Sequence, residues 1–169
     1  LYLGDMLVEN MIVSILPDSL IYYGVPQGII GMNLICDLKR FEISKNGDLS
    51  FDVSNNEIQN NMMICNTYPL VECISGNDTL TFYMDTGSNI CELTHNYYIK
   101  HRNTINSDEK FTSVQAGVGQ NKKLIILKAK NFPVKIGDSA TVPEIDIHYS
   151  ESPNLNFFDI DGVLSQCII

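Results

Sequence analysis

The sequence has little charge, and the charge that it has is mostly negative. Only 18% of the residues are charged, and 11 Lys and Arg stand against 20 Asp and Glu, which gives a net charge of −9 at pH 7. The basic residues form no stripe, so the chain lacks the positive surface that binds a phosphate backbone. We therefore expect no nucleic-acid partner and interpret the acidic excess as general solubility.

Long apolar runs are also missing. No stretch approaches the roughly 20 apolar residues that a membrane helix needs, so no membrane span is expected. The first residue is not Met and no signal peptide is visible, so Leu1 is interpreted as the start of a fragment or of a processed chain that has lost a leader. Localisation stays unknown on this basis, with an exported protein (periplasmic or cell envelope) favoured.

The spacing that binds metals is absent as well. Five cysteines include no Cys-x-x-Cys pair, and the three histidines do not cluster with them. Zinc sites draw on such clusters, so no metal and no other cofactor is expected. We interpret the cysteines as small apolar residues of the interior, and leave open one disulfide and the redox compartment.

Short strand-like segments, separated by turns, run along the chain. With 44% hydrophobic residues, the chain can bury one substantial core or two small ones. Alternating runs flank Lys45–Asp48, where Asn-Gly predicts a tight hairpin, and a second hairpin is expected around Ser75–Thr79. A helical pattern is confined to residues 93–102. This pattern predicts an all-β, barrel-like fold. Further strands are expected at residues 11–16, 28–35, 111–114, 123–127, 134–137, 144–149 and 161–164.

Three segments near the start of the chain are echoed near its end, at an offset of 133 to 134 residues. The matching pairs are 3–5 with 136–138, 11–15 with 144–148, and 28–32 with 162–166. We interpret residues 1–53 as the closing half of a first lobe and residues 62–169 as most of a second. Residues 54–61 predict a linker, since six of the eight are Ser, Asn or Gln.

The sharpest motif is Asp85-Thr86-Gly87-Ser88-Asn89, which directly follows the apolar run Leu80–Met84. An isolated Asp-Thr-Gly triplet usually marks a turn. A carboxylate in a tight turn at the end of an apolar strand is, however, held in place and partly removed from water. That placement suits acid–base chemistry.

With this turn the chain resembles the retropepsin-like aspartic peptidases, which share the pepsin-type acid-protease fold. The resemblance rests on the Asp85 turn, a glycine-bearing flap candidate at Ala116–Gln120 and a closing Gly162–Leu164, in that order. It implies acid-protease-like β-barrel lobes and hydrolysis of peptide bonds. The family's closing motif usually ends in glycine. Gly28–Asn33 fits this motif better than residues 162–165, where Ser165 replaces the usual glycine.

The resemblance also implies roles for individual residues. Asp85 would be one of two catalytic aspartates that activate a water molecule. Thr86 would lock two such loops together by hydrogen bonds, Gly87 would permit the turn, and Ser88 would support the carboxylate.

The flap residues are the expected substrate-binding site. They would close over an extended peptide and exclude water from the cleft. The residues concerned are Ala116, Gly117, Val118 and Gly119.

The chain contains no second Asp-Thr-Gly or Asp-Ser-Gly. Asp138-Ser139-Ala140 comes close, but the repeat aligns Asp138 with Asp5, so this segment is interpreted as a turn. The expected partners are therefore a peptide or protein substrate and a second aspartate-bearing lobe or subunit.

Three interpretations stay open at this point. The first is a two-lobed endopeptidase with the other aspartate upstream of Leu1, and the second is a homodimer with one Asp85 per chain. Residues 1–53 argue against the homodimer, because a half-enzyme needs no second closing half. The third is a catalytically inactive peptide-binding protein of the acid-protease fold, which Ser165 favours.

Overall fold

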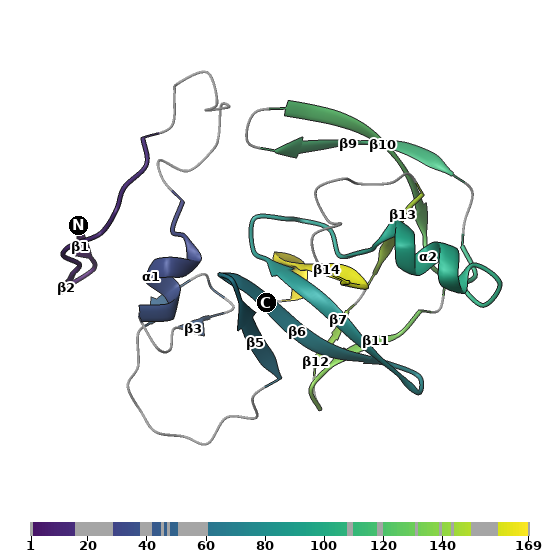
Figure 1. Ribbon diagram of the computed structural model, residues 1–169, viewed down its shortest axis with the longest axis horizontal. Coiled ribbons are helices and arrows are strands. Elements are labelled where there is room, and N and C mark those ends of the chain that lie inside the picture. The colour runs from purple at the N-terminus through teal and green to yellow at the C-terminus, as the bar shows by residue number, and fades with distance from the viewer. Residues whose placement is uncertain are drawn as a thin grey trace.

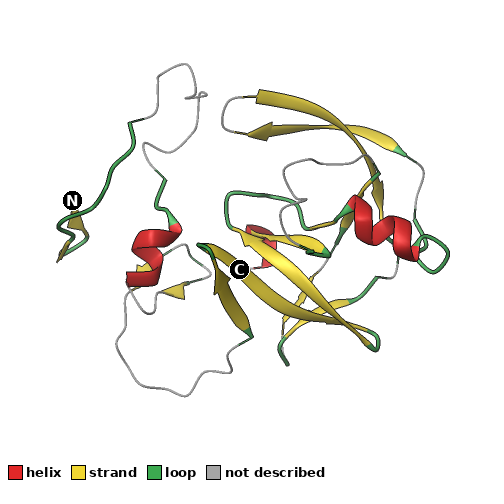
Figure 2. Cartoon of the chain, in the orientation of Figure 1, coloured by secondary structure: helices red, strands yellow, loops and turns green. Residues whose placement is uncertain are grey.

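The computed structural model describes residues 2–15, 29–37, 42–44, 46, 48–50, 61–107, 110–117, 120–130, 132–138, 140–142, 144–149 and 159–168. Strands dominate the regular structure (Figures 1 and 2), and the predicted all-β class is confirmed. The strands of the first part are β1 (Tyr2–Leu3), β2 (Met6–Leu7), β3 (Glu42–Ile43) and β4 (Leu49–Ser50). Those of the second part are β5 (Met62–Cys65), β6 (Tyr68–Ser75), β7 (Asp78–Asp85), β8 (Glu92–Leu93), β9 (Phe111–Gly117), β10 (Gln120–Lys128), β11 (Val134–Ile136), β12 (Ala140–Val142), β13 (Asp146–His148) and β14 (Gly162–Ser165). The helices are α1 (Met32–Asp37), α2 (His95–His101) and the 3-10 turn η3 (Gln166–Ile168).

The strands from β5 onwards form one mixed sheet. Its order is β12-β11-β6-β7-β14-β8-β13-β10-β9, with β5 also paired to β6. The hairpin predicted around Ser75–Thr79 is confirmed by the antiparallel pairing of β6 with β7, and β9 and β10 form a further hairpin. The last strand, β14, runs parallel to β7 and antiparallel to β8. It therefore lies between the two strands that the Asp85 turn connects.

Side-chain alternation divides this sheet into two faces. One face carries the apolar core, in a row that the strand register brings together: Leu127, Ile147, Leu93, Phe82 and Val71. The next row, on the opposite face, consists of Lys128, Asp146, Glu92, Val163, Tyr83 and Leu70. Asp85 lies two residues beyond Tyr83, so its side chain belongs to this second face.

Gly162 stands in the core row because a side chain has no room there. A Cβ atom at this position would overlap the Phe82 ring and lie 2.5 Å from the carbonyl oxygen of Glu92. The ring of Phe82, which is fully buried, occupies the space instead. The closing glycine of the sequence motif is thus explained by packing between β7 and β8.

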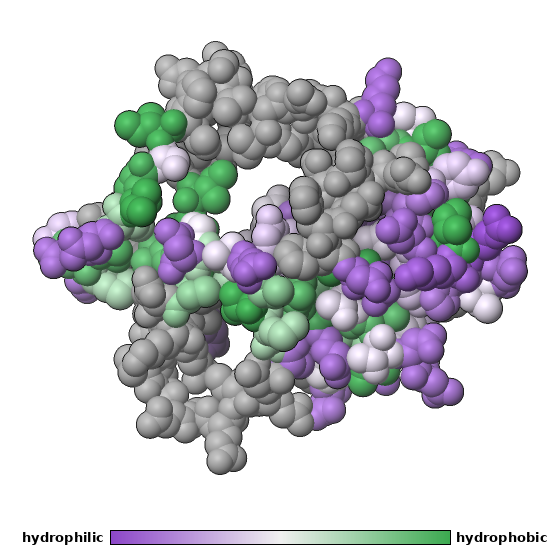
Figure 3. Space-filling view, in the orientation of Figure 1, coloured by the Kyte–Doolittle hydropathy of each residue, from purple (hydrophilic) through white to green (hydrophobic). Residues whose placement is uncertain are grey.

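The prediction of strands at 11–16 and 28–35 is wrong for the residues that the structure describes. Met11–Ile15 and Ile29–Gly31 have no regular structure, and helix α1 begins at Met32; Leu16 and Gly28 lie outside the described residues. No described strand pairs with these segments, so nothing takes up the hydrogen bonds of an extended backbone. Most of their apolar side chains are exposed, and Figure 3 shows apolar residues gathered on the left of the molecule.

Two of the expectations for local structure are met. The Lys45–Asp48 hairpin is confirmed by the pairing of β3 with β4. Helix α2 lies within the predicted 93–102 segment and is capped by Thr94, whose hydroxyl accepts a hydrogen bond from Tyr97 N at 3.2 Å. Helix α1 was not expected. In the part of the chain described, no helix is long and apolar enough to cross a membrane.

Candidate active site

Asp85 is the last residue of β7 and has β14 as a neighbouring strand. In the parallel pairing of β7 with β14, Asp85 stands beside Ser165. The chain then leaves the sheet and returns seven residues later at the start of β8. Residues 86–91 therefore form a loop between β7 and β8, the two strands that pair with β14.

The carboxylate of Asp85 is half-buried and is held at one oxygen only. Its Oδ1 accepts a hydrogen bond from Gly87 N at 2.9 Å, and its backbone oxygen accepts one from Ser88 N at 3.1 Å. The Oδ2 atom makes no hydrogen bond to any described residue. One oxygen thus orients the group while the other stays available.

Gly87 suits this turn because of how close it lies to the carboxylate. Its φ is not in the left-handed region, unlike that of Gly76 or Gly137. A Cβ atom at Gly87 would lie 3.2 Å from Asp85 Oδ1, tighter than ordinary packing. Glycine here keeps the hydrogen bond to the carboxylate short.

The Ser88 hydroxyl closes the loop on itself. It donates to Ile90 O at 3.0 Å and accepts from Ile90 N at 3.3 Å, so it braces the backbone rather than the carboxylate. The carbonyl oxygen of Ser88 accepts from Gln166 N at 3.1 Å, which ties the loop to η3. Thr86 is exposed, and its hydroxyl makes no hydrogen bond within the described ranges.

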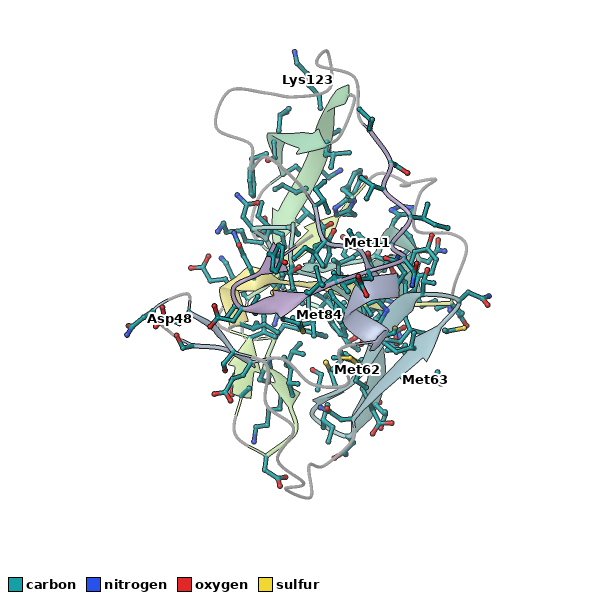
Figure 4. All side chains as sticks on the ribbon, turned by 90° about the vertical axis from the view of Figure 1, so that its left-hand side faces the viewer. Met11, Asp48, Met62, Met63, Met84 and Lys123 are labelled. Carbon is teal, nitrogen blue, oxygen red and sulfur yellow. The ribbon has the colours of Figure 1, made fainter. Side chains whose placement is uncertain are left out.

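The hairpin of β9 and β10 contains part of the expected substrate-binding site. Ala116 pairs with Asn121 and Gly117 with Gln120, while Val118 and Gly119 lie outside the described residues. Figure 4 shows Lys123 on the end of this hairpin, away from Met84, which precedes Asp85. The substrate-binding role of these residues stays a prediction.

Ionisable groups gather on the face of the sheet that carries Asp85. Burial, and secondarily the negative charge of Asp85, raises the pKa of Tyr83. Further along the face, His148 Nε2 pairs with Glu92 Oε2 in the buried interior, and His148 Nδ1 has no hydrogen-bond partner in the part of the chain that the structure describes. Burial likewise raises the pKa of Asp146, with the nearby Glu92 adding to the effect and Lys128 opposing it. No three His, Cys, Asp or Glu side chains among the described positions could together hold a metal ion.

Two supports of the site carry no sequence signal. Asp161 joins β7 to the start of α2: its Oδ2 and backbone N bond to Thr81 at 2.9 and 2.8 Å, and its carbonyl oxygen accepts from Thr94 N at 2.9 Å. Cys91, at the end of the Asp85 loop, contacts Ser165, which pairs with Asp85. Neither contact could be found from spacing, because the partners lie 80 and 74 residues apart in the chain.

Comparison with known proteins finds similarity to solved structures alone. No protein-family model and no curated protein matches it. Among solved structures it is similar to the EIAV protease complexed with the inhibitor HBY-793, at 16% identity and a TM-score of 0.40, over 60% of this chain and 84% of that one. It is also similar to a retropepsin-like aspartic protease from Rickettsia conorii, at 17% identity and a TM-score of 0.36, over 59% and 68% of the two chains.

Proposed function

We propose that this protein is an aspartic-type endopeptidase and that Asp85 is one of its two catalytic aspartates. The observation that carries the proposal is the one-sided support of the carboxylate, at the end of an apolar strand. Gly87 N holds Oδ1, whereas Oδ2 has no partner among the described residues. An oriented carboxylate with one available oxygen is what activation of a water molecule requires.

The chemistry needs a second carboxylate close to Asp85. Two carboxylates a few ångström apart do not both ionise readily, so the pair shares one proton. The ionised member removes a proton from water, which attacks the peptide carbonyl carbon. The protonated member polarises the carbonyl oxygen and then helps to protonate the leaving amine.

A second lobe or subunit would supply the other aspartate. Thr86 supports this arrangement, since its exposed hydroxyl is available for a hydrogen bond to a matching loop. The exposed apolar side chains of Ile12 and Ile15 also favour a further packing partner for residues 1–53, the proposed closing half of a first lobe. The expected flap residues, Ala116–Gly119, would cover the bound peptide.

A catalytically inactive peptide-binding protein of the same fold is the second candidate. It is favoured by the presence of a single Asp-Thr-Gly in the 169 residues. Both candidates would bind a peptide, but only the endopeptidase would cleave it. A binding measurement alone therefore does not distinguish them.

Cleavage of a mixed peptide library from about pH 3 to pH 7 tests the proposal. The unaltered protein should cleave best in acid, and Asp85→Asn should abolish cleavage while the fold is retained. Asp138→Asn is the matched control, because Asp138 is exposed on the β11–β12 turn and its loss should leave cleavage unchanged. Peptide binding without cleavage by the folded protein, assayed with the lobe or subunit that supplies the second carboxylate, would favour the second candidate.

A further inference from the structure

A buried pair of side chains adjoins the Asp85 loop. Cys91 is 1% exposed and Ser165 is 0% exposed. The sulfur of Cys91 accepts a hydrogen bond from the Ser165 backbone N at 3.3 Å and lies 3.4 Å from the Ser165 hydroxyl oxygen. One thiol therefore meets both the main chain and the side chain of the same residue.

The position of this pair relative to the loop is specific. Ser165 stands beside Asp85 in the parallel pairing of β14 with β7, and Cys91 closes the loop at its other end. The next residue, Gln166, donates its backbone N–H to the carbonyl oxygen of Ser88 at 3.1 Å. Strand β14 and its continuation thus contact the loop at its beginning, middle and end.

We propose that Cys91 and Ser165 act together as positioning residues for Asp85. The inference rests on the proposed function and deepens it. Serine at position 165 is then no sign of a lost active site, although glycine is usual there in the resembling family. Serine, unlike glycine, places a hydroxyl in this buried position. The polarisable sulfur of Cys91 gives that hydroxyl a hydrogen-bond partner. The thiol holds β14 against the loop, and the loop in turn holds the carboxylate.

The first test compares turnover of single variants. Cys91→Ala removes the sulfur that makes both contacts and should lower kcat by about tenfold or more with KM changed by less than about twofold, since the reacting group is misplaced rather than the peptide site lost. Cys91→Ser retains a donor and acceptor and should recover much of the loss. The double variant Cys91→Ala with Ser165→Ala should be little worse than Cys91→Ala alone, because the two residues act as one unit.

Ser165→Gly separates this proposal from its opposite. If Ser165 marks a decayed site, restoring glycine should raise turnover. If Ser165 is half of a positioning pair, Ser165→Gly should lower kcat by a few-fold. A rise in kcat for Ser165→Gly would overturn the proposal.

The second test reads the loop without any activity. Exchange of the backbone amides of Gly87 and Gln166 reports the hydrogen bonds to Asp85 Oδ1 and Ser88 O. Cys91→Ala should accelerate both by about tenfold relative to Val134→Ala, a control that removes a fully buried side chain from β11, away from the loop. Equal exchange in the two variants would overturn the positioning role. An unaltered protein that cleaves nothing would remove the proposed function instead, and the exchange rates would still decide whether the pair holds the loop.

Discussion

Residues 3–32 and residues 136–166 share a sequence pattern but differ in the structure that they form. The β1–β2 and β11–β12 hairpins both turn at a glycine in the left-handed region, Gly4 at φ 58° and Gly137 at φ 56°. Helix α1 and the turn η3 also begin at corresponding positions, 134 residues apart. The local turns are therefore alike in the two copies.

The apolar segments between these turns differ sharply. Ile145 is 3% exposed, whereas its counterpart Ile12 is 88% exposed. Val163 in β14 is 3% exposed, against 65% for Ile29. Turns form from local conformational preference, while an apolar segment becomes a buried strand only where neighbours pair with it. In the second copy β7 and β8 enclose β14, and no described strand does so for Ile29.

The largest expected effect comes from truncating a matched pair of apolar residues. Leu164→Ala should lower the free energy of unfolding by about 2–5 kcal/mol, because Leu164 is fully buried in the core. Its counterpart Ile30 is 43% exposed, so Ile30→Ala should cost less than about 1 kcal/mol. Denaturant unfolding measures both. Equal losses of stability would contradict this prediction and show that Ile30 is as buried as Leu164.

The two hairpin glycines should differ less than the core residues do. Gly137→Ala should cost about 1–2 kcal/mol, because alanine is strained in the left-handed region and β11 belongs to the large sheet. Gly4→Ala carries the same strain in a hairpin outside that sheet, so the main unfolding transition should barely move. A large shift of that transition by Gly4→Ala would show that the two regions unfold as one unit.

A difference in pH dependence should follow from Asp146, whose counterpart in the first copy is the apolar Val13. Burial raises the pKa of Asp146 in the folded state above its ordinary value of about 3.9. The folded state therefore binds the proton more tightly, and this contribution to stability is lost as the pH rises through the folded-state pKa.

Asp146→Asn removes this ionisation. The variant should lose less stability than the unaltered protein between about pH 4 and pH 7, as thermal unfolding across that range would show. Asp138→Asn serves as the exposed control. Parallel pH curves for the Asp146→Asn variant and the unaltered protein would contradict the prediction.

The smallest expected effect is on Tyr83, two residues before Asp85. The negative charge of Asp85 contributes to the raised pKa of Tyr83, after burial. Asp85→Asn should therefore lower the pKa of Tyr83, measured by NMR titration of ring-labelled tyrosine. An unchanged Tyr83 titration would mean that the Asp85 charge does not act along this face of the sheet.

Much of the second region could be predicted from its residues. The alternation of Leu80, Phe82 and Met84 and the turn at Gly76-Asn77 place β6, β7 and the Asp85 turn, because these are local signals. The insertion of β14 between β7 and β8 could not be found in this way, since Gly162 pairs with Phe82, 80 residues earlier. The contact between Cys91 and Ser165 could not be predicted either, because the sheet alone brings these two small residues together.

The measurement that bears most directly on Asp85 is the ratio of kcat/KM between the unaltered protein and Asp85→Asn, for the best library peptide at its best pH. A loss of at least about 10³-fold, with Asp138→Asn unchanged, is the expected result. Cleavage by folded Asp85→Asn at the unaltered rate would contradict the assignment of Asp85 as a catalytic aspartate.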